Sequence, residues 1–492
     1  MLSTFFENVL IYISVLPIVG AVLLMFISSN NFKLLKLIAL NFSSLPFLGS
    51  LLVWAYFKKS IAQFQFVTKI YWLPILNLNA TLGIDGISLF FLLLTTMLIP
   101  VCLLLSWNSV KKNLKYYLIA FLLLEFFLIG VFCILDLLLF YIFFESVLLP
   151  TFLIIGIWGS RERKTLASYY FFLYTLLGSV ITLIGILYIY YQIGTTDYEI
   201  LLTFSFSELE QKFLWFAFFL AFAGKVPMMP VHLWLPEAHV EAPTAGSVVL
   251  AGILLKLGTY GLIRYSIPLF PKASFFFTPF VYTISVIGIV YASFTAIRQS
   301  DFKRIIAYTS IAHMNLVIIG IFSFNSMGLE GAVFQSLSHG FVASALFLVI
   351  GIVYDRYHTR IVKYYSGLAS VMPIYTLSFV FFTMANISFP GTSSFIGEFL
   401  ILTGSFKSNT SITFLGATGV ILGAVYSLWL LNRIAFGNMK VQYYEKFFDL
   451  NKREFTCFLP LIIGTFFLGV APNIILSSIS MSVNCLIEFI YF

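Results

Sequence analysis

An apolar run of membrane-span length, residues 213–238, is interrupted by the stretch AGKVPMMP at positions 223–230. Proline removes a backbone N–H and clashes with the preceding helical turn, so a helix must kink or unwind at Pro227 and Pro230. Backbone groups freed in this way are tolerated inside a bilayer only where they face protein or a water-filled cavity. The stretch therefore predicts a broken membrane helix that places Lys225 beside an ion pathway.

A second apolar run, residues 369–404, carries NISFPGTSS at positions 386–394, where Pro390 breaks it in the same way. Paired interruptions in the two halves of a transporter are typical of inverted repeats whose broken helices border the ion pathway. We therefore predict a repeated architecture. Its parts are an N-terminal region of three helices, a first repeat, a second repeat and a C-terminal helix with a tail, at residues 1–113, 114–267, 274–432 and 433–492.

The composition is that of a protein whose solvent is lipid. Of the 492 residues, 60% are hydrophobic and 10% are charged, whereas soluble domains average about 25% charged residues. A soluble fold of this length could not bury so much apolar surface. The net charge of +8 does not indicate nucleic-acid binding, because the Lys and Arg residues lie in short loops and form no basic domain.

About fourteen apolar runs are long enough to span a bilayer as helices, so we predict an all-α polytopic membrane protein. No alternating pattern typical of a β-barrel is present. Residues 472–492 are interpreted as an amphipathic or partly inserted tail. The predicted spans are 9–28, 37–57, 82–106, 114–132, 135–158, 165–192, 213–238, 243–267, 274–297, 303–323, 329–354, 369–404, 411–432 and 455–472.

The basic residues predict the orientation of these spans. Most of the 28 Lys and Arg residues lie in the odd-numbered loops, and Arg264 is counted among the basic residues of the even-numbered loops. The positive-inside rule places the odd loops in the matrix or cytoplasm and both termini on the intermembrane-space or periplasmic side. The 57 Phe residues fit an AT-rich organelle genome, which favours a mitochondrial inner membrane over a bacterial plasma membrane.

Ionisable side chains at membrane depth are candidates for function, because burying charge in lipid is costly. Glu145 lies in mid-span, Lys225 lies beside the first break, and Glu398 follows the second break. Lys256 lies too far inside its span to reach the interface. A lysine balanced between burial, which disfavours its charge, and a carboxylate, which favours it, can take up and release a proton.

Other titratable residues support this pathway less strongly. His339 and His313 could shuttle protons, because histidine titrates near neutrality, or could be satisfied core residues. Glu125 has no clear assignment, and Asp136 is interpreted as a helix cap. The inner end of the first broken span forms either a proton entrance or a solvated loop, and its polar residues are His232, Glu237, His239 and Glu241.

No motif indicates nucleotide, metal or redox chemistry. The four cysteines are isolated in apolar segments, and no CxxC pair, P-loop, HExxH motif or dinucleotide-binding turn occurs. We therefore expect no metal and no cofactor on this chain.

Three segments resemble the chain 4 family of NADH:ubiquinone oxidoreductase (respiratory complex I), whose members are antiporter-like membrane subunits. The longest is GKVPMMPVHLWLPEAHVEAPTAGS at 224–247, which continues as LAGILLKLG at 250–258. The others are DLLLF at 136–140, leading to Glu145, and FPGTSSFIGEF at 389–399. The resemblance extends over residues 82–471.

The resemblance implies a fold of fourteen helices with two inverted five-helix repeats, and it implies proton translocation. Glu145 and Lys225 would form the charge pair of the channel, with Lys256 as the central relay. His313 and His339 would be hydrated connectors, and Glu398 would serve the exit. NADH, FMN, iron–sulfur clusters and ubiquinone would be held by other subunits, and the partners would be membrane-arm subunits, including neighbouring antiporter-like subunits.

Three alternatives remain open from the sequence. An Mrp-type cation/proton antiporter subunit would share the repeats and the buried lysines but need no redox partner. A plastid dehydrogenase subunit is related, although VEAPTAG at 240–246 fits the respiratory form better. A purely structural membrane-arm subunit would use its buried charges for assembly alone.

Overall fold

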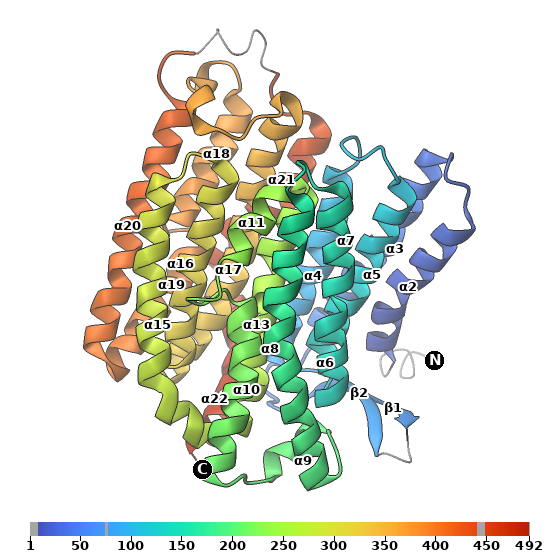
Figure 1. Ribbon diagram of the computed structural model, residues 1–492, viewed down its shortest axis with the longest axis vertical. Helices are drawn as coiled ribbons and strands as arrows, with labels where there is room; N and C mark the ends of the chain where they lie inside the picture. The colour runs from blue at the N-terminus through green and yellow to red at the C-terminus, as the bar shows by residue number, and fades with distance from the viewer. Residues whose placement is uncertain (1–7, 74–76, 440–447, 492) are drawn as a thin grey trace. The chain divides into compact units, whose positions relative to one another are not determined.

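The structure is a computed structural model that describes residues 8–73, 77–439 and 448–491 (Figure 1). The described residues divide into two compact units. The first contains the chain up to Val226, Ile253–Thr278 and the chain from Ser477 onwards. The second contains Pro227–Gly252 and Pro279–Leu476. One boundary between the units therefore falls within the AGKVPMMP stretch.

The first unit is a bundle of long helices with one β-hairpin. Its helices are α2 (Val9–Phe26), α3 (Phe32–Tyr56), α4 (Gly86–Leu105), α5 (Leu114–Cys133), α6 (Leu137–Ser146), α7 (Leu148–Trp158), α8 (Lys164–Ile193), α9 (Tyr198–Thr203), α10 (Glu208–Lys225), α13 (Leu255–Gly261), the π-helical turn η3 (Leu262–Ser266), α14 (Ile267–Leu269) and most of α22 (Asn473–Tyr491). The antiparallel strands are β1 (Gln65–Leu73) and β2 (Leu78–Ile84).

The second unit is helical. It contains α11 (Trp234–Glu241), α12 (Thr244–Val249), α16 (Phe302–Ile321), α17 (Ser326–Tyr357), the 3₁₀ turns η4 (Val362–Tyr364) and η5 (Leu368–Ser370), α18 (Pro373–Asn386), α19 (Ser393–Ser408), α20 (Thr410–Ala435) and α21 (Lys452–Val470). The helix α15 (Pro271–Arg298) and the π-helical turn η2 (Leu250–Leu254) run from one unit into the other.

Thirteen helices in the described ranges are long and apolar enough to cross a membrane, which confirms the predicted all-α polytopic class. The set omits the predicted spans 213–238 and 369–404, each of which the structure divides between two helices. α10 has 18 residues but carries four charged side chains, and α18 and α19 have only 14 and 16 residues. It includes α22, which the sequence analysis treated as a tail.

The β-hairpin was not predicted from the sequence. The predicted span 82–106 begins inside β2, whereas α4 begins at Gly86. Asp85 sets this start, because its side chain accepts a hydrogen bond from the backbone N–H of Ser88 and the Ser88 hydroxyl accepts one from the N–H of Asp85. This capping box satisfies two of the free N–H groups at the helix end.

Both predicted helix breaks are present. α10 ends at Lys225, and Pro227 and Pro230 lie in the link that leads to α11. α18 ends at Asn386, and Pro390 lies in the link that leads to α19. In that second link Gly391 has a φ of 93°, a conformation that glycine adopts without steric cost.

α19 lies against α17 at very short range, and glycines make this possible. A Cβ atom placed on Gly397 would lie 2.8 Å from the Cα of Gln335. One placed on Gly331 would lie 2.7 Å from the backbone nitrogen of Ile401. Small residues at membrane helix interfaces allow backbones to approach in this way. The contact holds Glu398, the neighbour of Gly397, against α17.

Candidate functional site

The first charged centre is formed by Glu145 near the end of α6 and Lys225 at the end of α10. Lys225 Nζ lies 3.7 Å from Glu145 Oε1, and the two side chains are 4% and 15% exposed, respectively. This distance makes an ion pair that is longer than a direct hydrogen bond. The structure thus brings together two of the four ionisable residues singled out from the sequence.

Phe144 supplies two further contacts to Lys225. Its backbone carbonyl accepts a hydrogen bond from Nζ at 2.6 Å. Nζ also lies 3.1 Å from the centre of the Phe144 ring, and a desolvated cation–π contact is worth about 2 kcal/mol. The ammonium therefore has neutral partners that remain in place if Glu145 changes its charge.

Lys256 lies on α13, between the π-helical turns η2 and η3, and is fully buried. π-helical turns within α-helices occur frequently at functional sites. A Cβ atom on Gly258 would lie 2.6 Å from Val226 Cγ2 and 2.7 Å from the carbonyl oxygen of Phe222. The helix that carries Lys256 therefore packs directly on the end of α10, where Lys225 is located.

The second charged centre surrounds Glu398 on α19. Glu398 Oε1 lies 2.9 Å from His313 Nδ1 of α16 and accepts a hydrogen bond from Gln335 Nε2 of α17 at 3.1 Å. All three residues are largely buried. The structure joins two of the residues proposed from the sequence and adds Gln335. The sequence signal for Gln335 was a single amide inside an apolar span, one helical turn before Ser338 and His339.

His339 extends this centre. Its ring centre lies 5.8 Å from that of His313. The neighbouring Ser338 hydroxyl lies 2.8 Å from Ser393 Oγ and 2.9 Å from Ser394 Oγ, at the start of α19. The helix that follows the second break therefore begins with hydroxyl groups that contact the segment carrying His339.

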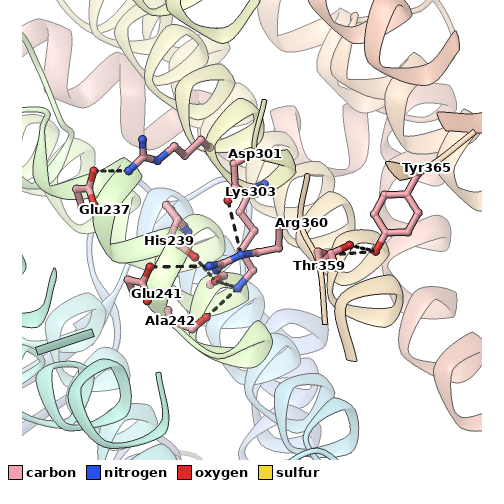
Figure 2. A network of polar contacts seen from close by, with 11 residues as sticks. Glu237, His239, Glu241, Ala242, Asp301, Lys303, Thr359, Arg360 and Tyr365 are labelled. Carbon is pink, nitrogen blue, oxygen red and sulfur yellow. Dashed lines mark hydrogen bonds and ion pairs between the residues drawn. The ribbon is translucent and has the colours of Figure 1, made fainter. Parts of the chain in front are cut away.

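A third polar cluster joins the end of α11 to the start of α16 and the loop after α17 (Figure 2). Lys303 Nζ donates to the carbonyl oxygen of Ala242 at 2.8 Å and to Ser247 Oγ at 3.2 Å. Arg360 has Asp301 at 3.6 Å and Glu241 at 3.8 Å. Lys303 and Arg360 are both fully buried. From the sequence, both residues belong only to the basic residues of the odd-numbered loops.

The two histidines considered for a proton entrance are both buried. His239 is fully buried beside this cluster, and its ring is stacked on Phe347 at 4.4 Å. Its backbone carbonyl accepts a hydrogen bond from Ser247, which also contacts Lys303. His232 lies in the link after α10, with its ring 5.7 Å from Tyr291. The alternative of a solvated loop is wrong for these two side chains.

The two weaker acidic candidates differ in the structure. Asp136 caps α6, accepting a hydrogen bond from the N–H of Leu139 at 2.9 Å and another from the Thr196 hydroxyl at 2.6 Å. The cap interpretation is therefore confirmed. Glu125 on α5 is fully buried, and within the described residues its carboxyl oxygens have no hydrogen-bond partner.

Arg264 was assigned to a loop from the sequence, and that assignment is wrong. It lies in η3, is 6% exposed, and places Nη2 2.5 Å from Asp85 Oδ1. Tyr198 on α9 lies beside the guanidinium, with its ring centre at 5.7 Å, and burial raises the pKa of its hydroxyl to about 12. The basic character of this segment therefore serves a buried ion pair.

Within the described ranges, no group of three or more His, Cys, Asp and Glu residues is arranged to hold a metal ion. Several of the described titratable residues in the membrane helices instead form pairs and short chains, Glu145 with Lys225 and His313 with Glu398. Such chains suit the transfer of protons between neighbouring groups.

Broken membrane helices with ionisable groups beside them define an antiporter-like ion-translocating membrane protein. Residues 134–425 match the family model described as NADH:quinone oxidoreductase/Mrp antiporter, TM. The chain belongs to this family, and within it to the NADH-ubiquinone oxidoreductase chain 4 proteins. It is 58% identical over 472 residues to the chain 4 protein of Arabidopsis thaliana, covering 96% of this chain and 95% of the relative.

Further relatives and solved structures agree with this placement. The chain 4 protein of Marchantia polymorpha is 57% identical, covering 99% of this chain and 98% of that protein. A chain of respiratory complex I from Thermus thermophilus superposes with a TM-score of 0.89 at 26% identity, covering 98% of this chain and 99% of that chain. A chain of the Mrp complex from Dietzia reaches 0.86 at 19% identity, covering 99% and 100%, a similarity of fold.

Proposed function

We propose that this chain is a proton-translocating membrane subunit of NADH:ubiquinone oxidoreductase. Electron transfer from NADH to ubiquinone would occur in other subunits and would drive proton movement through this one. The observation that carries the proposal is the Glu145–Lys225 pair, because a buried ion pair beside a broken membrane helix can change its protonation when it opens.

The proton would move in steps through the charged residues. When Lys225 and Glu145 separate, the ammonium loses electrostatic support and can release its proton towards Lys256. His339, His313 and Glu398 would carry the proton onward. Each charge that crosses the membrane costs about 2.3 kcal/mol per 100 mV of potential. In this proposal the energy for proton movement is released by electron transfer in other subunits. The direction of proton movement would therefore be set by coupling to neighbouring subunits.

The location and assembly of the chain are part of the same proposal. Relatives from plants and algae support placement in the mitochondrial inner membrane, with both termini on the intermembrane-space side. The partners would be other membrane-arm subunits, including neighbouring antiporter-like subunits. The two halves, residues 114–267 and 274–432, would be inverted repeats that each supply one broken helix.

The proposed role of the first centre is tested by Lys225→Met and Glu145→Gln in the assembled enzyme. Removal of a proton donor or acceptor should lower the rate of quinone-dependent turnover, and the proton uptake that accompanies it, on the order of 100-fold. NADH oxidation by an acceptor that bypasses quinone should be unchanged. Asp136→Asn serves as a control, because asparagine also caps helices well. Wild-type pumping in both Lys225→Met and Glu145→Gln would overturn the proposal.

An assembly role alone makes a different prediction for Lys256. Under that alternative, Lys256→Met would reduce the amount of assembled enzyme but leave the number of protons moved per NADH unchanged. Under the proposed function, the enzyme that assembles should show the same loss of pumping as Lys225→Met. Quantifying the assembled complex beside its pumping in one preparation separates the two.

A further inference from the structure

A cavity of about 350 Å³ lies in the first compact unit, and its wall includes Arg264 of η3. The rest of the wall comes from the loop before β1, the start of α4, α9, α14 and α22. Gln63 and Glu199 in this wall are exposed, so the cavity opens to the surface. That surface belongs to even-numbered loops, which the positive-inside rule places in the intermembrane space.

The cavity lies close to Lys256, the proposed central relay. Lys256, Tyr260 and Arg264 follow one another at intervals of four residues along one run of helix. Residues four apart lie on the same helix face, and eight residues rise by about 12 Å. A proton on Lys256 is therefore separated by only two or three helical turns from a cavity that opens on the opposite side of the membrane from the basic loops.

Aromatic rings from three other helices pack around Tyr260 in this interval. The ring centre of Tyr260 lies 6.0 Å from that of Phe91 on α4, 5.1 Å from that of Phe132 on α5 and 6.4 Å from that of Phe140 on α6. Phe91 and Phe132 are also stacked on each other at 5.3 Å. Rings at these distances are in direct contact. None of the four residues, which we call the aromatic layer, is more than 2% exposed.

The hydroxyl of Tyr260 is held by two groups that do not exchange protons. It donates a hydrogen bond to the backbone carbonyl of Phe132 at 3.3 Å and accepts one from Arg264 Nε at 3.3 Å. A guanidinium stays protonated in proteins, and a backbone carbonyl only accepts hydrogen bonds. The Tyr260 hydroxyl therefore has no neighbour in this pair of bonds with which it could relay a proton.

Arg264 adds an electrostatic obstacle on the cavity side of the aromatic layer. Its guanidinium is paired with Asp85, and the two residues are 6% and 4% exposed. An arginine at a narrow point of a membrane pathway excludes protons and other cations. A proton that reached the Asp85 carboxylate from the cavity would meet this charge before it met Tyr260.

We infer that the aromatic layer and Arg264 form a proton barrier, which keeps Lys256 from exchanging protons with the cavity on the intermembrane-space side. Tyr260 is the central positioning residue of this barrier, because it contacts every other member of the aromatic layer and Arg264. This inference rests on the proposed function, since a barrier is needed only if Lys256 carries protons. It implies that a proton leaves Lys256 only in the direction of the second unit.

The test measures passive proton flux through the assembled enzyme in sealed vesicles while quinone reduction is inhibited. A potassium diffusion potential drives the flux, and a pH-sensitive dye inside the vesicles reports it. Tyr260→Ala should raise the flux per assembled enzyme several-fold, because the freed Arg264 N–H and Phe132 carbonyl can hold water where the ring was. During turnover, an uncoupler should no longer accelerate this variant.

Two controls keep the flux at the wild-type level if the barrier is where we place it. Tyr260→Phe retains the ring and loses only the hydroxyl. Phe219→Ala removes a buried ring that is stacked on Trp215 at 4.6 Å, outside the aromatic layer. A rise in Phe219→Ala as large as in Tyr260→Ala would overturn the inference, because any core cavity would then conduct protons.

Further variants make the result decisive. Phe132→Ala opens the same layer and replaces Tyr260→Ala if that variant does not assemble. Wild-type flux in the assembled variant of the layer would overturn the barrier. Adding Lys256→Met to the leaking variant should abolish the leak, and a leak that persists would show that the barrier does not protect Lys256. Because the flux is measured without turnover, these outcomes are distinct from pumping by Lys256→Met alone, which tests the proposed function.

Discussion

Single residues in this chain differ in how far their roles follow from sequence. Glu145 and Lys225 were identified because the cost of a charge in lipid is a property of each residue and its apolar neighbours. Their pairing at 3.7 Å required the fold. The roles of Gln335 and Arg264 were not predicted, because each depends on a partner that is distant in the sequence. No local sequence pattern indicates such a partner.

The Asp85–Arg264 pair provides a prediction about stability. Asp85→Asn keeps a good helix cap for α4 but removes the only charge that the structure pairs with Arg264 among its described salt bridges. Breaking a buried ion pair at one partner costs about 3 to 5 kcal/mol, because the other charge stays buried. The variant should therefore unfold at a clearly lower temperature in a thermal scan of the detergent-solubilised enzyme.

The control for that variant is Asp197→Asn. Asp197 caps α9 by accepting a hydrogen bond from the N–H of Glu199, and none of the salt bridges among the described residues includes it. Its substitution should leave the unfolding temperature almost unchanged. Equal shifts in the two variants would mean that loss of the Asp85–Arg264 ion pair does not account for the change in unfolding temperature.

At the scale of helices, the breaks were predictable and the hairpin was not. Each break follows from proline, which disrupts the helical turn directly before it, so its place can be predicted from the sequence alone. The residues are Pro227, Pro230 and Pro390. The β1–β2 hairpin depends on pairing between strands, which apolar composition does not reveal. The predicted span 82–106 ran through Asp85 and Gly86, although this pair is both a turn signal and a helix start. The character of α22 was ambiguous, because an apolar helix of this length suits either a span or an interfacial helix.

The α17–α19 contact leads to a prediction about packing. In Gly397→Ala the new methyl group would meet the Cα of Gln335 at 2.8 Å and its side-chain oxygen at 2.5 Å. Overpacking of this kind costs about 1 to 3 kcal/mol. It should also displace Gln335 from Glu398, so that both thermal stability and proton pumping fall.

Gly416→Ala on α20 is the comparison for Gly397→Ala. Its methyl group would make only ordinary contacts, 3.5 Å or more from Ile319 and Leu316, and alanine favours a helix over glycine. Its thermal stability should equal or exceed that of the wild type. A loss of stability in Gly416→Ala as large as in Gly397→Ala would contradict the packing argument.

At the scale of the whole molecule, the two charged centres belong to different compact units. Glu145, Lys225 and Lys256 lie in the first unit, and His313, His339 and Glu398 lie in the second. The sequence predicted both groups from the cost of buried charge, but it supplied no order in which they act. The order in which the two centres act on a proton can be measured with variants of each centre.

If the centres act in series on one proton, blocking either one stops the same flow. Glu145→Gln combined with Glu398→Gln should then lower proton-coupled turnover no further than the more severe single variant does. With two independent routes, each single variant would leave the proton flux of the other route intact, and the double variant would lose both, so the losses of flux would add. Measuring turnover and proton uptake for both single variants and the double variant, in equal amounts of assembled enzyme, distinguishes the two cases. An additive loss would mean that each unit moves protons by itself, and Lys256 would then be a terminus and not a relay.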